Sequence, residues 1–462
     1  MSPSSVPLSW FSQLRALAAA ILAAAACTAF ALDGQLRSHD PSTVARCNGR
    51  YYVFSTGPGI PILESDDGFT WKSGGRVFET IPESVRSLSP KNDGKLVWAP
   101  DIIEVNGEYL LYYSVSAWGS FVSAVGLITN PTLDRNDPRY KWTDRGPIVN
   151  STEGQDLNAI DPGVVQGPDG ALWLCYGSYH GNIEVVQLDP KTGLRIAPNS
   201  PVTVVANRSE AADIIYRDGW YYLFVNHGSC CKGKDSGYNI RVGRARNVTG
   251  PYLDRDGENL ANGAGTLFLA AAGKQIGPGH FGRLFDDGVE KFSCHYEADL
   301  DRGGRPVLDI RPLLWTLDGW PQPGANVKEG MYQFVSERTG SVVERSPKHL
   351  EDGEITVGTY VVLDNQQWTV TSAGGGYHRI QLLADGKALQ ASKGEGTGAA
   401  VQVAPTAESD AQLWKIDQLT DGTYRVMSKA AKQALTVAPG QGMLSLQPFD
   451  GARAQRWRIS AP

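Results

Sequence analysis

Three acidic residues, Asp40, Asp161 and Glu210, lie at matching places in short repeated stretches of this chain. Each lies nine residues before the glycine of an Asn-Gly or Asp-Gly pair, and an apolar run follows that pair. A single Asp-Pro is more simply a turn or the start of a strand. Carboxyl groups gathered in one place raise one another's pKa, at a cost that a structural role does not require. Their recurrence therefore favours glycoside hydrolysis, which needs one carboxyl group as acid and another as base.

The repeated stretches also indicate how residues so far apart would meet. Two further copies carry Ala99 and His280 at or next to the same position, so the chain holds five copies. Each unit has room for four short strands separated by turns rich in glycine. Such a unit cannot bury its own faces, and the series predicts an all-β fold, a five-bladed β-propeller over residues 32–322. The innermost positions of the blades converge on the propeller axis, which would place the three carboxylates in one pocket.

A second repeat occupies the C-terminal part of the chain. Gln366, Gln412 and Gln455 each stand two residues before a tryptophan, at spacings of 46 and 43 residues. Three units of this length predict a β-trefoil over residues 331–462 with the tryptophans in a shared core. Residues 323–330, next to a Trp-Pro-Gln-Pro-Gly stretch, are expected to form the linker.

Residues 1–31 have the pattern of a secretory signal peptide. An apolar run over residues 14–26 contains the single positive charge Arg15, and Ala29-Phe30-Ala31 is a small-x-small cleavage sequence. The run is short for a transmembrane span, and a lipoprotein signal at Cys27 or an uncleaved buried segment are the alternatives. We therefore expect a secreted or periplasmic protein with no membrane partner. The net charge of −6, with no basic stripe, argues against nucleic acid as a partner.

Five cysteines remain after residue 31, and an odd number excludes complete pairing within one chain. Cys175 and Cys294 fall in expected strands and are predicted to be buried thiols. Cys230 and Cys231 are adjacent in a loop-like stretch, where a vicinal disulfide remains open.

Several of these motifs resemble glycoside hydrolase family 43, whose members are five-bladed propellers that degrade arabinan and xylan. The resemblance covers about residues 33–322 and rests on these stretches: His39-Asp40-Pro41, Trp98-Ala99-Pro100-Asp101, Ala159-Ile160-Asp161-Pro162 and Ser209-Glu210-Ala211. Two further stretches resemble the arabinanases of the family in particular. They are Gly277-Pro278-Gly279-His280, and Ile310-Arg311-Pro312-Leu313 followed by Asp318-Gly319-Trp320-Pro321. The C-terminal region resembles the ricin-type trefoils.

The resemblance implies roles for the three carboxylates. Asp40 would be the general base that activates water, Glu210 the general acid, and Asp161 the residue that orients Glu210 and keeps its pKa raised. The implied activity is inverting, endo-acting hydrolysis of α-1,5-L-arabinan by a secreted enzyme. The alternatives are an exo-acting α-L-arabinofuranosidase or β-xylosidase on the same fold, and a non-catalytic protein that binds sugar in both domains.

Further residues are expected to bind the substrate, a plant cell-wall polysaccharide such as arabinan or arabinoxylan. In the propeller they are Trp98, Asp101, Trp118, Ser178, Tyr179 and His180. The two tryptophans would stack on sugar faces, although Trp98 suits the propeller core equally well. His180 stands where the arabinanases usually have an aromatic residue, which leaves the sugar and the endo or exo mode open.

Two more sites are expected, and the protein is expected to be a monomer. The resemblance implies that His280 contacts a calcium-like ion on the propeller axis, with water as most of the shell; a hydrogen-bonded structural histidine is the alternative. In the trefoil, Glu344, Gln390 and Thr436 occupy matching places, and only Glu344 is charged. We therefore expect at most one weak sugar site there, around Glu344.

Overall fold

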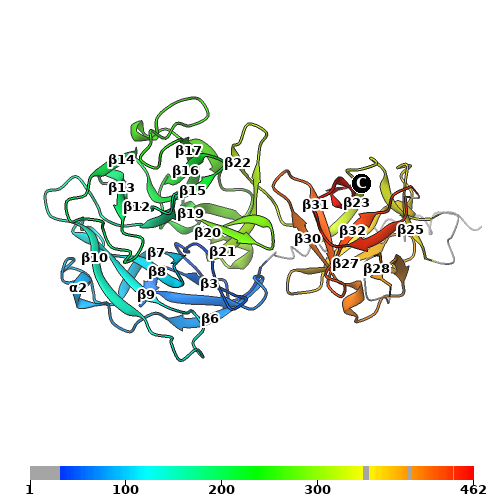
Figure 1. Ribbon diagram of the computed structural model, residues 1–462, viewed down its shortest axis with the longest axis horizontal. Helices are drawn as coiled ribbons and strands as arrows, with labels where there is room; N and C mark the ends of the chain where they lie inside the picture. The colour runs from blue at the N-terminus through cyan, green and yellow to red at the C-terminus, as the bar shows by residue number, and fades with distance from the viewer. Residues whose placement is uncertain (1–31, 347–352, 393–397, 441) are drawn as a thin grey trace, which may run out of the picture.

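The computed structural model describes residues 32–346, 353–392, 398–440 and 442–462, and Figure 1 shows them as two β-rich bodies side by side. The expected signal peptide, residues 1–31, lies outside the described residues. Within the described ranges, helices are limited to α2 (Glu83–Arg86) and short 3-10 turns. None of these helices is long and apolar enough to cross a membrane.

Five separate sheets form the first body and confirm the predicted propeller. Blade 1 consists of β1 (Asp33–Gly34), β6 (Thr70–Arg76), β5 (Pro61–Ser65), β3 (Arg50–Phe54) and β2 (Ala45–Cys47). Blade 2 consists of β10 (Thr143–Ser151), β9 (Ser123–Asn130), β8 (Glu108–Val115), β7 (Leu96–Val105) and β4 (Gly57–Pro58). Blade 3 consists of β11 (Gly163–Gln166), β12 (Leu172–Gly177), β13 (Asn182–Leu188) and β14 (Val202–Asn207). Blade 4 consists of β15 (Glu210–Arg217), β16 (Trp220–His227), β17 (Asn239–Ala245) and β18 (Thr266–Leu269). Blade 5 consists of β19 (Gln275–Asp286), β20 (Val289–Asp299), β21 (Arg305–Trp315) and β22 (Pro321–Pro323).

The first described residues join the first blade to the last. Strand β1 pairs in parallel with β6 of blade 1. A few residues later, the carbonyl of Leu36 accepts a hydrogen bond from the backbone N–H of Leu308 at 2.8 Å, and Arg37 pairs with Val307 in β21. These bonds close the ring of blades, so the ends of all innermost strands are held around one axis.

One unusual backbone position recurs in all five blades. Positive φ angles occur at Asp40 (47°), Ala99 (38°), Asp161 (56°), Ala211 (53°) and His280 (53°). This left-handed conformation is costly for residues other than glycine. In every blade the N–H of this residue donates to a side chain of the preceding blade, and the bonds are Ala99 to Thr56 (2.8 Å), Asp161 to Ser114 (2.9 Å), Ala211 to Asp161 (3.1 Å), His280 to Asn226 (3.2 Å) and Asp40 to His295 (3.1 Å). These bonds offset the strain and tie each blade to its neighbour.

This recurrence confirms the equivalence of Asp40 and Asp161 but corrects the register of Glu210. In blade 4 the left-handed residue is Ala211, so Glu210 stands one residue before the equivalent position. The glycine count failed because the distance from the left-handed residue to the turn glycine is not constant: it is nine residues in blades 1 and 3 and eight in blades 2, 4 and 5. The side chain of Glu210 is therefore presented by the end of a strand and not by the left-handed residue itself.

The second body is the predicted trefoil. Its strands are β23 (Gly330–Ser336), β24 (Val342–Arg345), β25 (Ile355–Gly358), β26 (Trp368–Ser372), β27 (Tyr377–Leu382), β28 (Ala388–Ala391), β29 (Val401–Ala404), β30 (Trp414–Gln418), β31 (Tyr424–Ser428), β32 (Ala434–Val437), β33 (Leu444–Gln447) and β34 (Trp457–Ser460). Trp368, Trp414 and Trp457 are completely buried in one core. Each indole N–H donates to a backbone carbonyl, that of Val343, Leu389 or Leu435 respectively. These tryptophans belong to the core, as predicted, and are not platforms for sugar.

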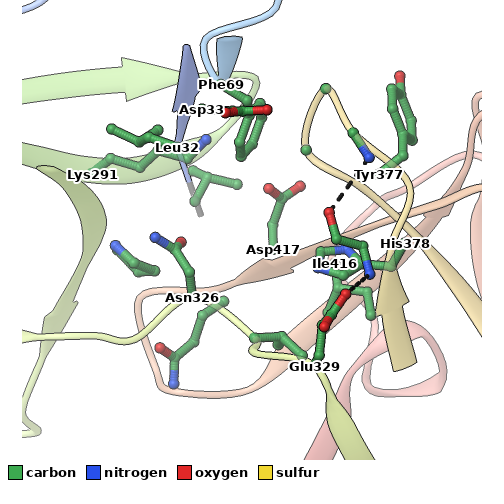
Figure 2. Close-up of a pocket in the computed structure, with 18 of the residues that line it drawn as sticks. Leu32, Asp33, Phe69, Lys291, Asn326, Glu329, Tyr377, His378, Ile416 and Asp417 are labelled. Carbon is green, nitrogen blue, oxygen red and sulfur yellow. Dashed lines mark hydrogen bonds between the residues drawn. The ribbon is translucent and has the colours of Figure 1, made fainter. Parts of the chain in front are cut away.

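The two bodies contact each other through an ion pair and a shared cavity. Arg425 of the trefoil, only 3% exposed, lies 2.9 Å from Asp417 of its own domain and 2.7 Å from Asp287 of the propeller. A cavity of about 250 Å³ lies beside this contact, and Figure 2 shows Phe69 and Lys291 from the propeller facing Tyr377 and His378 from the trefoil. The linker between β22 and β23 is thus not the only connection between the domains.

Candidate active site

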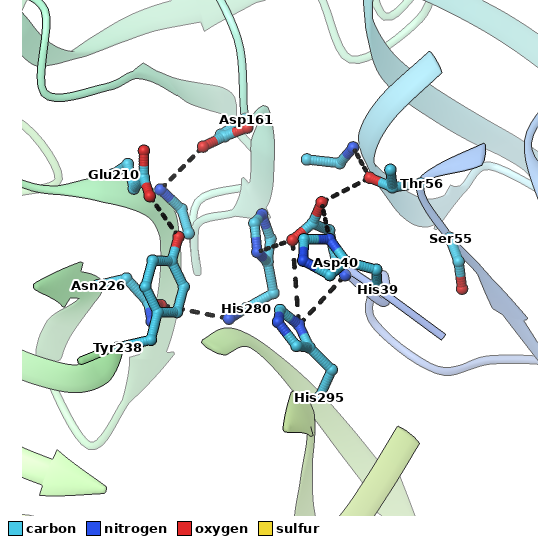
Figure 3. Close-up of polar contacts among 12 residues, drawn as sticks. His39, Asp40, Ser55, Thr56, Asp161, Glu210, Asn226, Tyr238, His280 and His295 are labelled. Atoms are coloured by element: carbon cyan, nitrogen blue, oxygen red, sulfur yellow. Dashed lines mark hydrogen bonds and ion pairs between the residues drawn. The ribbon is translucent and has the colours of Figure 1, made fainter. Parts of the chain in front are cut away.

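One pocket of about 280 Å³ gathers the three predicted carboxylates, Asp40, Asp161 and Glu210. They come from blades 1, 3 and 4: Asp40 and Asp161 precede the innermost strands β2 and β11, and Glu210 begins β15. Figure 3 shows Glu210 and Asp40 on either side of His280. The convergence expected from the repeats is therefore present.

Asp40 is surrounded by groups that favour its charged form. Its Oδ1 lies 2.9 Å from Nδ1 of His280, and its Oδ2 lies 2.8 Å from Nδ1 of His39. The hydroxyl of Thr56 also donates to Oδ2, at 2.6 Å. Burial opposes ionisation, but the two histidines outweigh it and hold the pKa of Asp40 well below its usual range. Asp40 is thus a carboxylate near neutral pH, as a general base must be.

Glu210 has the opposite environment. Burial, with the nearby charge of Asp161 as the second cause, raises the pKa of Glu210 to about 8. The Tyr238 hydroxyl donates to Oε1 of Glu210 at 2.6 Å, which opposes this rise. Glu210 is therefore protonated at neutral pH and can deliver a proton to a leaving oxygen.

Asp161 lies against the backbone that carries Glu210. Its Oδ2 accepts the N–H of Ala211 at 3.1 Å, and burial, opposed by His280, raises the pKa of Asp161 to about 6. Near neutral pH this carboxyl is mainly charged. It both fixes the start of β15 and supplies the negative charge that keeps Glu210 protonated.

The arrangement separates the pKa values of neighbouring carboxyl groups, and this is the feature that distinguishes an acid from a base in one site. An ionised Asp40 faces a protonated Glu210 across a pocket open to solvent. That pair can activate water on one side of a glycosidic bond and protonate its oxygen on the other.

Aromatic side chains form the walls of the pocket. Trp98 and Trp118 approach with ring centroids 5.2 Å apart, and Trp118 is 73% exposed. On another wall, the ring of His180 stacks on Phe121 with centroids 3.6 Å apart. The exposed indole of Trp118 and the His180–Phe121 pair are flat apolar surfaces of the kind on which sugar rings pack.

Ser178 and Tyr179 also line the pocket, at the end of β12. The Tyr179 hydroxyl donates to the carbonyl of Asn226 at 3.1 Å, which ties blade 3 to blade 4. Ser178 is buried and its hydroxyl lies 3.4 Å from Nδ2 of Asn158. Both positions agree with the expected placement in the cleft.

The structure corrects the role expected for Asp101. We expected it to bind substrate, but it is buried and does not line the pocket. Its Oδ1 accepts the N–H of Thr43 and its Oδ2 accepts the N–H of Val164, each at 3.0 Å. The carboxylate joins blades 1, 2 and 3 through their backbones, so its role is structural.

Sequence reasoning missed Tyr238, the hydrogen-bond partner of Glu210. It lies in the segment between β16 and β17, which carries no signal of its own. A signal exists elsewhere, because a Cβ at Gly279 would lie 2.4 Å from the Tyr238 ring. The Gly-Pro-Gly-His stretch therefore makes room for this tyrosine. His39, Thr56 and the Cys230–Cys231 pair were also not expected in the pocket, although they line it.

His280 lines the pocket and was expected to contact a calcium-like ion. Its Nδ1 faces Asp40, while its Nε2 is buried with no hydrogen-bond partner. Among the described residues, His280 belongs to no cluster of three close ligand groups. Burial lowers the pKa of His280, but Asp40 outweighs it and raises that pKa to about 8. Once it has lost its proton, Nε2 fits an ion that takes a single protein ligand and otherwise water.

Glu344 lies in the trefoil, on β24, and its Oε2 accepts from Nε2 of Gln366 at 2.6 Å. The same bond recurs at the equivalent places, from Gln412 to Gln390 (2.8 Å) and from Gln455 to Thr436 (3.3 Å). The predicted equivalence of these positions is confirmed. Glu344 retains a second carboxylate oxygen for another partner.

Comparison with known proteins agrees with the geometry. Residues 34–321 match the family model described as glycosyl hydrolases family 43, and residues 364–443 match the ricin-type beta-trefoil lectin domain-like model. The chain is 37% identical over 346 residues to the extracellular exo-alpha-(1->5)-L-arabinofuranosidase ArbA of Cellvibrio japonicus, covering 71% of this chain and 95% of that protein. It is 35% identical over 293 residues to the extracellular endo-alpha-(1->5)-L-arabinanase 1 of Bacillus subtilis, covering 61% and 86% respectively.

Among solved structures, the propeller resembles the α-L-arabinanase of Cellvibrio cellulosa in complex with arabinohexaose. The identity is 34%, the TM-score is 0.59, and the match covers 63% of this chain and 96% of that one. The family model covers more than half of the chain, and the site holds the acid and base that a glycosidase requires. The chain therefore belongs to glycosyl hydrolases family 43.

Proposed function

We propose that this protein hydrolyses α-1,5-linked L-arabinan in an endo-acting manner and with inversion at the anomeric carbon. The observation that carries the proposal is the opposite ionisation of Asp40 and Glu210 in one pocket. The relatives named above, an arabinofuranosidase and arabinanases, support arabinan as the polymer.

In the proposed reaction, Asp40 takes a proton from water and Glu210 gives its proton to the leaving oxygen. His39, His280 and Thr56 contact both carboxylate oxygens of Asp40 and hold the base in position. After the reaction Glu210 is ionised and accepts from Tyr238. Trp118 and the His180–Phe121 pair offer flat surfaces to the sugars on either side of the cleaved bond.

An exo-acting arabinofuranosidase is the second candidate, and one relative at 37% identity bears that name. The two modes differ in their products. An endo enzyme acting on linear arabinan releases a ladder of oligosaccharides early, whereas an exo enzyme releases one short product from the start.

The test is a time course of the products from linear arabinan, with β-1,4-xylan as the control polymer. We expect an early ladder from arabinan, no products from xylan, and a first-formed reducing sugar of inverted configuration by NMR. A single short product would support the exo mode. Hydrolysis of xylan alone, or retention of configuration, would contradict the proposal.

We also propose that His280 contacts a calcium-like ion through its Nε2. The support is the buried, unpartnered nitrogen inside the pocket, next to Asp40. When bound, such an ion would add positive charge beside the carboxylates. The residues themselves still perform the proton transfers described above.

For the trefoil we propose one weak carbohydrate site around Glu344. The charge and second oxygen of Glu344 suit a sugar diol, whereas Gln390 and Thr436 at the equivalent places carry no charge. Glu344→Ala should abolish retention of the full chain on an insoluble polysaccharide that the propeller does not hydrolyse. Retention that survives this change would contradict the single-site proposal.

We further propose that the protein is exported, in accordance with the extracellular relatives and the signal-like residues 1–31. It would act as a monomer on a plant cell-wall polysaccharide, arabinan or arabinoxylan. A periplasmic location is the alternative, and fractionation of a native host distinguishes the two.

A further inference from the structure

Beside Asp40, on the side away from His280, three side chains of different chemistry lie together. They are His39, Cys231 and Glu297, and their ligand atoms all lie within 4.8 Å of one another. We propose that this cluster binds a borderline divalent transition-metal ion such as Zn²⁺, and that the bound ion inhibits hydrolysis. The inhibition rests on the proposed role of Asp40 as the base, whereas the binding does not.

His39 is already oriented as metal-binding histidines are. Its Nδ1 lies 2.8 Å from Oδ2 of Asp40, and its Nε2 lies 3.4 Å from Oε1 of Glu297. A carboxylate on Nδ1 is the usual second partner of a metal-binding histidine and keeps the proton on that nitrogen. Without a metal, Nε2 also faces a carboxylate and carries a proton, which it loses when it binds the ion. Figure 3 shows the His39 ring directly beside Asp40.

Glu297 is buried and lies close to Cys231 and His295. Its side chain is only 2% exposed, and Oε1 accepts the backbone N–H of Cys231 at 2.7 Å. His295 accepts the N–H of Asp40 on Nδ1, so in the neutral ring its Nε2 carries the proton. That Nε2 is completely buried, lacks a hydrogen-bond partner and lies 3.9 Å from Oε1 of Glu297. It is placed to hold the carboxylate once an ion draws Glu297 towards His39.

Cys231 supplies the thiolate ligand and lies where an ion would enter from the pocket. It is exposed, lines the pocket, and stands in the left-handed conformation with φ 63°. Thiolate, imidazole and carboxylate together suit Zn²⁺, with bonds of about 2.0–2.3 Å, better than they suit calcium or magnesium. The ligand atoms must therefore approach by about an ångström, which an exposed cysteine side chain permits.

Three protein ligands leave one tetrahedral position for water, on the pocket side. Binding removes a proton from the Cys231 thiol and any proton on His39 Nε2, and both go to solvent. The ion then adds positive charge one imidazole ring away from Asp40, which makes that carboxylate a weaker base. The ion and its water also occupy the pocket wall beside Asp40.

The test uses the full chain after reduction with a phosphine, and a thiol titration verifies that the cysteines are free. A chelator then removes bound metals and is itself dialysed away. Co²⁺ serves as the probe, because thiolate ligation gives a near-ultraviolet charge-transfer band. We expect that band in the wild type, at one ion per chain, and its displacement by Zn²⁺. Cys231→Ser should abolish the band and weaken Zn²⁺ binding by more than about tenfold. Glu297→Gln should weaken binding, and Cys230→Ser, the matched control, should retain the band.

Hydrolysis of arabinan is measured in parallel, with each variant compared with its own metal-free rate. Zn²⁺ should inhibit the wild type and Cys230→Ser at concentrations that leave Cys231→Ser active. A missing cobalt band, or a band that survives in Cys231→Ser, would overturn the proposal. So would a band that is lost only in His280→Ala, because the ion would then lie at His280. If the wild type hydrolyses no arabinan, the function proposed above fails, and the cobalt spectrum still decides the metal site.

Discussion

The hydroxyl of Tyr238 donates a hydrogen bond to Oε1 of Glu210 at 2.6 Å, inside a pocket where burial and Asp161 both favour the protonated acid. A donor to a carboxylate stabilises its charged form. The tyrosine thus limits how far the pKa of Glu210 rises, and it gives the acid a partner once its proton has left.

Removing the tyrosine hydroxyl should extend activity to higher pH. In Tyr238→Phe the charged form of Glu210 loses its hydrogen-bond donor, so the pKa of Glu210 rises above about 8. The acid therefore stays protonated to higher pH. We expect the alkaline limb of the pH profile of kcat/KM to move up by about one unit. Tyr179→Phe is the matched control, because that hydroxyl donates to Asn226 and not to Glu210. A limb that stays in place in Tyr238→Phe would mean that the bond does not tune the acid.

Removing the neighbouring charge should have the opposite effect. In Asp161→Asn the carboxylate that raises the pKa of Glu210 is gone, so Glu210 loses its proton at lower pH. The alkaline limb of kcat/KM should move down by about one unit. An unchanged limb with a lower maximal rate would instead assign Asp161 to positioning alone.

Chelation should reveal an ion at His280. If the proposed ion is present, a chelator should lower either activity or the melting temperature, and calcium should restore it. His280→Ala should reproduce the loss and remove the response to calcium. A wild-type enzyme that is indifferent to the chelator would favour a structural histidine bonded to Asp40.

The buried ion pair of Arg425 and Asp417 within the trefoil should contribute strongly to stability. Arg425→Met leaves Asp417, 4% exposed at its side chain, without its guanidinium partner. Removing one partner of a buried pair costs about 3–5 kcal/mol, so the unfolding midpoint of the trefoil should fall clearly. Asp287→Asn, the control, removes a carboxylate whose side chain is 66% exposed and should cost at most about 1 kcal/mol. Equal losses in the two variants would show that the arginine acts between the domains and not within the trefoil.

The repeats made the fold and the catalytic centre predictable. Five spaced turns indicated five blades, and equal spacing from a turn glycine indicated that Asp40 and Asp161 hold one position. Counting from the turn failed at Glu210, because the left-handed residue is eight residues before the turn glycine in blade 4 and nine in blades 1 and 3, a difference that leaves no mark in the sequence. The side chain reaches the pocket all the same, since the strand end faces the axis.

Residues that depend on tertiary contacts were not predictable. Asp101 stands in a motif beside Trp98, yet its carboxylate turns to the backbone of two other blades. Tyr238 and Cys231 reach the pocket from loops whose path is set by packing against blade 5, where Gly277 and Gly279 make space. Periodicity locates strands, but it does not say to which side a loop carries its side chains.

The most direct test of the assigned roles is a comparison of Glu210→Gln with Asp40→Asn on two substrates, linear arabinan and an aryl arabinofuranoside with a good leaving group. A good leaving group needs little protonation, so Glu210→Gln should lose kcat/KM on arabinan by at least about a hundredfold and far less on the aryl substrate. Asp40→Asn should lose activity on both, because water must be activated in either case. Equal losses of Glu210→Gln on the two substrates, or a selective loss in Asp40→Asn, would contradict the assignment of Glu210 as the acid and Asp40 as the base.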